Sequence, residues 1–162
     1  MSMMSRKDFR EGGKDIMANR NFNGVQINQS VTIVEQAGEK IGDCRNRLMA
    51  YDTNGNVVLA ADGTKPIVGI ALIESGLNDI SGRDSGMVEA GGDVDIQIKD
   101  IGYVLAGAEI SKGAEITACE GGFATPAQAG NYVAGIALAS AEENDYCRVQ
   151  IAKYQKGSAA SK

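Results

Sequence analysis

Apolar and polar residues alternate with a period of two along several stretches of the chain. Such alternation is typical of a half-buried β-strand. It begins at residues 24–34, whose apolar positions are Val25, Ile27, Val31 and Ile33. Residues 93–99 and 146–154 show it again, and their expected inward positions are Val94, Ile96, Ile98, Cys147, Val149 and Ile151. Asp93, Asp95, Gln97 and Lys99 then face outward.

Turn signals separate these stretches. Asn54-Gly55 in residues 47–61 favours a tight hairpin between two strands, because both residue types tolerate positive φ. Residues 76–92 are rich in glycine and polar residues and predict a long connecting loop. A short helix around residues 35–46 is an alternative with poor periodicity. Short strands between such turns predict an all-β fold, a small barrel or sandwich of antiparallel strands.

The same patterns predict the domain organisation. Residues 1–23 are interpreted as a flexible, extended N-terminal arm, with residues 1–16 as a possible leader before a natural start at Met17. Residues 24–153 are expected to form one β-domain of two similar halves, about 24–75 and 93–153, joined by the loop 76–92. Residues 154–162 are expected to be a disordered tail.

A repeated phrase, Gly-Ile-Ala-Leu, supports the two halves. It occurs at 69–72 and again at 135–138, and at the same spacing Val57 falls on Phe123. Ile70, Leu72, Ile136 and Leu138 are predicted to fill a shared core. Glycine weakens a strand unless space is needed. Gly69 and Gly135 are therefore expected where a neighbour comes close, either another strand or another subunit.

Candidate chemistry is sparse. The chain has no histidine, the commonest general base and metal ligand, and it contains neither a G-x-S-x-G nor a phosphate-loop motif. Asp93 and Asp95 could hold a cation, but a solvated acidic strand face is the favoured interpretation. Three cysteines, Cys44, Cys119 and Cys147, indicate reduced thiols in a protein made in a cytoplasm. We therefore expect no enzyme, no cofactor and no metal.

Charge and hydropathy exclude two kinds of partner. The net charge is −5 and no Lys/Arg cluster is visible, so direct nucleic-acid binding is not expected. The apolar runs are shorter than the ~20 residues that cross a bilayer, so no membrane association is expected.

Residues 102–151 resemble the small head-decoration, or capsid cement, proteins of tailed bacteriophages. The resemblance covers about residues 24–152 and is looser in the first half. It rests on a succession of glycine turns and short strands, namely Gly107 to Ile110, Gly113 to Thr117, Gly121-Gly122, Ala124 to Ala127, Gly130 to Leu138, Ser140 to Asp145 and Arg148 to Ile151.

The resemblance implies a non-enzymatic virion protein on the outer surface of the expanded phage capsid. It would clamp adjacent major capsid proteins and stabilise the head. The implied partners are the major capsid protein and further copies of the chain in a homotrimer, made in the host bacterial cytoplasm. An N-terminal segment can add a strand to a sheet edge. Candidate capsid or subunit contacts are Asn21, Phe22, Val25, Ile27, Gly69 and Gly135.

Other non-catalytic modules stay open. One is a phage tail or baseplate module, or another β-barrel binding module. A lipoyl or biotinyl carrier domain would need a modifiable lysine in a defined context, which Lys99 and Lys112 do not match. A carbohydrate-binding module would place aromatic residues on one exposed strand face. The five tyrosines, Tyr51, Tyr103, Tyr132, Tyr146 and Tyr154, instead look scattered.

Overall fold

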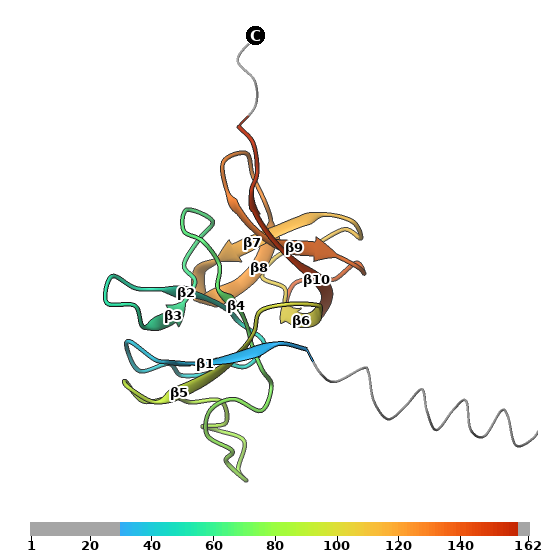
Figure 1. Cartoon of the computed structure of the whole chain (residues 1–162). Coiled ribbons are helices and arrows are strands. Elements are labelled where there is room, and N and C mark those ends of the chain that lie inside the picture. Colours follow the sequence, from blue (N-terminus) through green and yellow to red (C-terminus); the bar gives the residue numbers. More distant parts are fainter. Residues whose placement is uncertain (1–29, 159–162) are drawn as a thin grey trace, which may run out of the picture. The chain divides into compact units, whose positions relative to one another are not determined.

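A computed structural model describes residues 30–158 of the chain (Figure 1). The chain divides into two units, Met1–Ser30 and Val31–Lys162, and everything below concerns the second. Its described part is all-β apart from one short 3-10 turn, Glu120–Gly122, as predicted from the sequence. The strands are β1 (Thr32–Gln36), β2 (Leu48–Tyr51), β3 (Val57–Leu59), β4 (Gly69–Ala71), β5 (Asp93–Gln97), β6 (Ile101–Leu105), β7 (Glu115–Cys119), β8 (Phe123–Pro126), β9 (Tyr132–Ala137) and β10 (Tyr146–Gln155).

The strands form two antiparallel sheets of five, which together make a sandwich and not a closed barrel. The first sheet has the order β1-β5-β4-β2-β3, and the second has the order β6-β10-β9-β7-β8. Adding five to each strand number of the first sheet gives the second. The internal repeat predicted from the sequence is therefore confirmed at the level of topology.

Isolated bridges fix which residues match between the halves. Ala37 pairs with Val57 in the first half, and Ala106 pairs with Ala124 in the second. Val57 thus matches Ala124, and the predicted match to Phe123 was wrong by one residue. The register slips because eleven residues lie between Val57 and Gly69, whereas ten lie between Ala124 and Gly135. A much larger difference in length follows the repeated phrase. Fifteen residues lie between Leu72 and Val88. Only two separate their counterparts, Leu138 and Ala141, which occupy the same bridging and hydrogen-bonding positions.

The boundary between the sheets falls after β5. The sequence placed residues 93–153 together in the second half, whereas β5 lies between β1 and β4 in the first sheet. Residues 76–92 lie between β4 and β5 and contain no strand, only one bridge from Val88 to Ile41. β10 extends to Gln155, two residues into the expected tail.

Two cores are present. The larger core lies between the sheets and combines second-half residues such as Val104 and Val149 with Leu48 and Ile70 of the first sheet. The smaller core lies on the opposite face of the first sheet and includes Ile96.

The repeated phrase faces these cores differently from the prediction. Ile70 and Ala137 pack in the core between the sheets, whereas Ala71 points into the smaller core of the first half. Ile136 and Leu138 are only half-buried. The shared core of four large residues was therefore wrong, because the second sheet turns Ala137, and not Ile136 or Leu138, toward the core between the sheets.

Three local predictions also need correction. Of the predicted inward residues of the first strand that the structure describes, Ile33 is a half-buried residue of β1. Val31 precedes β1 and is exposed, and Val25 and Ile27 lie outside the described residues. The alternative helix at 35–46 is absent from the structure. Gln97 is buried, because its side-chain amide donates to the carbonyls of Lys99 and Ile101.

The hairpin prediction at Asn54-Gly55 is confirmed. Only Gly55 takes positive φ, at 81°. The carboxylate of Asp52 accepts hydrogen bonds from the backbone N–H groups of Asn54 and Asn56 at 2.8 and 3.0 Å. This carboxylate therefore closes a turn, as the hairpin interpretation expects.

Candidate interaction surfaces

The described residues 30–158 contain no group of three His, Cys, Asp or Glu side chains able to hold a metal ion. They also contain no helix long and apolar enough to cross a membrane. Burial raises the pKa values of Cys44, of Cys147 and of the half-buried Cys119. Thiols with raised pKa values are poor nucleophiles. The exposed side chains of this part form its candidate contact surfaces.

The outer face of the second sheet carries exposed apolar side chains on adjacent strands. Tyr103 on β6 pairs with Arg148 on β10, and Tyr146 lies two residues before Arg148 on the same face. Tyr103 is 53% exposed and Tyr146 is 56% exposed. We call this the tyrosine face; it consists of Ile101, Tyr103, Tyr146, Arg148, Leu138 and Ile136. Two of the five tyrosines thus gather on one exposed face, although the sequence suggested that all were scattered.

The matching face of the first sheet has the opposite charge. Val34 on β1 pairs with Asp95 on β5, and Asp93 lies two residues before Asp95 on the same face. Val34 is 59% exposed. We call this the acidic face; it consists of Val34, Asp93, Asp95 and Leu72. The backbone carbonyl of Asp95 accepts a hydrogen bond from the N–H of Leu72 at 2.9 Å, and that of Arg148 accepts one from the N–H of Leu138 at 2.7 Å, so the two positions are structurally equivalent.

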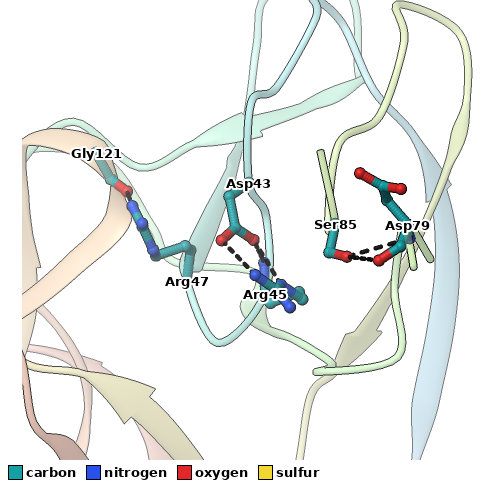
Figure 2. A network of polar contacts seen from close by, with 6 residues as sticks. All are labelled: Asp43, Arg45, Arg47, Asp79, Ser85 and Gly121. Atoms are coloured by element: carbon teal, nitrogen blue, oxygen red, sulfur yellow. Dashed lines mark hydrogen bonds and ion pairs between the residues drawn. The ribbon is translucent and has the colours of Figure 1, made fainter. Parts of the chain in front are cut away.

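The two halves are joined at the segment that enters β2 (Figure 2). Arg47 donates from its guanidinium to the carbonyl of Gly121 at 2.8 Å, and its charge lies 3.8 Å above the ring of Phe123. Asn46 donates to the carbonyl of Tyr103 at 2.9 Å. These contacts fix the first sheet against the second and therefore fix the two faces relative to each other.

Next to this junction, Asp43 and Arg45 form a close ion pair (Figure 2). The carboxylate of Asp43 accepts two hydrogen bonds from the guanidinium of Arg45, both at 2.9 Å. Partial burial acts to raise the pKa of Asp43, but the hydrogen bonds and charge of Arg45 outweigh it, so the pKa is lowered. Both side chains remain about one-third exposed. The pair therefore organises the turn without being a buried charge centre.

The long connection between β4 and β5 projects three apolar side chains. Ile73, Leu77 and Ile80 are exposed, and Ile80 fully so. Asp79 and Ser85 hold its tip through hydrogen bonds from the backbone N–H of Asp79 to the Ser85 hydroxyl and from that hydroxyl to the Asp79 carbonyl (Figure 2). This connection, residues 73–87, is a second candidate contact surface.

Each half also has one exposed tyrosine that donates to a glutamate. The Tyr154 hydroxyl donates to Glu115 at 2.5 Å, and this bond to the carboxylate raises the pKa of Tyr154 to about 12. The Tyr51 hydroxyl donates to Glu35 at 2.9 Å, and burial together with Glu35 raises the pKa of Tyr51. These bonds link β10 to β7 and β2 to β1, and they leave the phenols protonated at neutral pH.

The residues predicted as contacts do not coincide with these surfaces. Asn21, Phe22, Val25 and Ile27 lie outside the described residues. Gly69 and Gly135 are buried, and a side chain at either would collide with the backbone carbonyl of Gln97 or Gln150 respectively. The close neighbour predicted for both glycines is therefore the adjacent strand of the same sheet. A contact of these glycines with another subunit stays a prediction.

The sequence predicts the outward direction of Asp93 and Asp95, but the apolar part of either exposed face was not predicted. The signal was present in the outward positions of the two matching strands. These are Asp93 and Asp95 in residues 93–97, and Tyr146 and Arg148 in residues 146–150. Which edge strands adjoin them, and hence the positions of Val34 and Tyr103, depends on long-range pairing that no local pattern gives.

Comparison with known proteins adds one informative similarity. No protein-family model matches the chain, and no curated protein sequence matches it. The fold is similar to a crystal structure described as the head fiber gp8.5 N base in bacteriophage phi29. The similarity has a TM-score of 0.56 at 22% sequence identity, over 76% of this chain and 95% of the other. This similarity establishes a shared fold.

Proposed function

We propose that the protein is a non-enzymatic structural component of a tailed-phage virion, bound to the outer surface of the expanded head. It clamps adjacent major capsid proteins and so stabilises the shell. The observation that carries this proposal is the fold shared with a phage head fibre base over 76% of the chain. The succession of turns and strands in residues 102–151, which resembles head-decoration proteins, supports it independently.

The described surfaces suit this role. They offer exposed apolar and charged side chains on rigid strands and no group of metal-binding side chains. Residues 1–29 precede β1, which is an edge strand, and an extended segment can add a strand to a sheet edge of the shell. Binding only to the assembled, expanded state stabilises that state by linkage. A homotrimer in the virion, made in the host cytoplasm, completes the proposal.

Sedimentation with purified phage shells tests the proposal. The full chain is mixed with expanded and with unexpanded shells, and the pellets are analysed for bound protein. Co-sedimentation with expanded shells alone is the expected result. Absence of the protein from both pellets at concentrations well above those of the shell sites contradicts the proposal.

A truncation separates the arm from the β-domain. Removal of residues 1–29 should weaken shell binding while the thermal unfolding midpoint stays unchanged, since the described sheets begin at Thr32. Full shell binding by the truncated chain would remove the arm from the clamp and leave the faces of the sheets as the contact.

A further inference from the structure

We infer that the tyrosine face of one copy docks on the acidic face of a second copy, with Arg148 opposite Asp95 in the centre of the contact. This inference names the surfaces of self-association in the proposed function and rests on it. The two faces occupy equivalent places in the two sheets, so each copy presents one face of each kind.

The match between the faces is position by position. Val34 and Tyr103 lie on the edge strands β1 and β6, directly opposite Asp95 and Arg148 respectively. On the other side, the backbone N–H groups of Leu72 and Leu138 donate to the carbonyls of Asp95 and Arg148 respectively. Each face is therefore an exposed apolar residue, a central charge and a half-buried leucine in one row. The central charges are opposite in sign.

The side chains have the chemistry of a protein contact. Tyrosine and arginine are enriched at interfaces and supply most of the energetic hot spots. Tyr103, Tyr146 and Ile101 are each more than half exposed, and they lie together instead of being dispersed singly. Such a grouped apolar patch marks an interaction site. Within residues 30–158, neither Arg148, Asp95 nor Asp93 takes part in an ion pair, so their charges are available to a partner.

The net charge of the chain and the packing of its own two sheets favour a second copy as the partner that covers each face. The net charge of −5 makes two copies repel overall, so association needs a local attraction such as Arg148 with Asp95. Within each copy, residues next to the acidic face already pack against the second sheet. Leu48 and Ile70 of the same face are buried against the second half, where Gly102 lies close to Ile70.

The contact joins two different faces and is therefore heterologous. Contacts of this kind either close into a cyclic oligomer or continue as a filament. In a closed ring every copy uses both faces, so each copy makes two contacts. A small cyclic oligomer is thus the simplest assembly that leaves neither face exposed.

Charge reversal with rescue tests the inference on the full purified chain, without capsid shells. Its outcome is therefore independent of whether the protein binds capsids. Molar mass is measured by light scattering during size exclusion over a concentration series. The wild type should be oligomeric. Asp95→Arg and Arg148→Asp should each weaken association at least tenfold, and the double variant D95R/R148D should regain it. The matched control is Lys112→Asp, an exposed charge reversal away from both faces, which should leave the mass unchanged.

Each opposing outcome overturns the inference. It is wrong if the wild type is monomeric at all concentrations, if either single reversal leaves the oligomer intact, or if the double variant stays dissociated. Tyr103→Ser with Tyr146→Ser removes the apolar part without altering charge and should also weaken association. The wild type could instead be monomeric and bind soluble glucan oligosaccharides. If the two tyrosine substitutions abolish that binding, the tyrosine face is a saccharide site and the inference is wrong.

Discussion

Gly69 and Gly135 have nearly the same surroundings, whereas Asp95 and Arg148, at equivalent places one strand away, carry opposite charges. A side chain at Gly69 would meet Gln97 and Ile96, and one at Gly135 would meet Gln150 and Val149. Both glycines are enclosed by backbone, and both charged residues lie on an outward face. The comparison teaches that strand packing constrains inward positions in the two halves alike, while each outward face can acquire its own role.

The largest expected effect comes from adding a side chain at the inward glycine that the two halves share. Gly69→Val and Gly135→Val should each destabilise the fold by on the order of 3 kcal/mol, because the added side chain must displace a neighbouring strand. Chemical denaturation measures this cost. Gly42→Val is the control, since Gly42 has negative φ and no atom within 4 Å of an added Cβ. Wild-type stability of either glycine variant would show that the neighbouring strand separates easily. This result would contradict the conclusion that strand packing constrains the two glycines alike.

The next effect concerns one position that is buried in one half and solvated in the other. Leu48 pairs with Ile70, and Glu115 pairs with Ile136, so Leu48 and Glu115 are equivalent. Leu48→Ala should cost about 3 kcal/mol, because Leu48 is fully buried between the sheets. Glu115→Ala should cost much less, because its ion pair with Lys156 is partly exposed. Equal costs at the two positions would mean that the sheets do not pack as described.

These two positions also show how far the sequence could predict the structure. The alternation of apolar residues gave the strands, and the repeated phrase revealed the two halves. It could not reveal that Leu48 and Ile70 are covered by the second sheet while Ile136 is not, because that depends on how one half docks on the other. The assignment of β5 to the first sheet depends on long-range pairing for the same reason. The candidate faces became visible only once β1 and β6 were placed beside β5 and β10.

A smaller effect concerns the first half alone. Gly42 and Asp43 are extra residues there, since Ile41 matches Ile110 and Cys44 matches Ser111. The pKa of Asp43 is lowered in the folded protein, so its pair with Arg45 stabilises the fold above the ordinary value of 3.8. That contribution is lost as the pH falls from 3.8 through the folded pKa. Asp43→Asn should destabilise by less than about 1 kcal/mol at neutral pH, because the pair is partly exposed.

Urea unfolding from neutral to acidic pH measures this loss. The stabilities of Asp43→Asn and wild type should converge at the acid end of the series. Asp62→Asn is a control in an exposed turn, where Asp62 accepts hydrogen bonds from Thr64 and has no ion pair among the described residues. A difference between Asp43→Asn and wild type that persists unchanged at low pH would exclude the Arg45 pair as its cause.

The smallest effect distinguishes the two tyrosine–glutamate pairs. The pKa of Tyr154 is raised to about 12 by its bond to Glu115, whereas the pKa of Tyr51 is raised by burial first and by Glu35 second. A raised pKa means that the folded state holds the phenol proton more tightly. Stability from this bond is therefore complete below the ordinary value of 10 and declines as the pH rises toward 12.

Ultraviolet absorbance titration of the phenolates follows both tyrosines on the folded chain. Glu115→Gln should lower the pKa of Tyr154 toward its ordinary value of 10, because the amide keeps the shape of the acceptor but carries no charge. Glu35→Gln is the matched variant in the other half and should leave Tyr154 unchanged, since Glu35 bonds only Tyr51 among these phenols. If Glu115→Gln leaves the late-titrating phenol in place, the bond to Glu115 is not what raises the pKa of Tyr154.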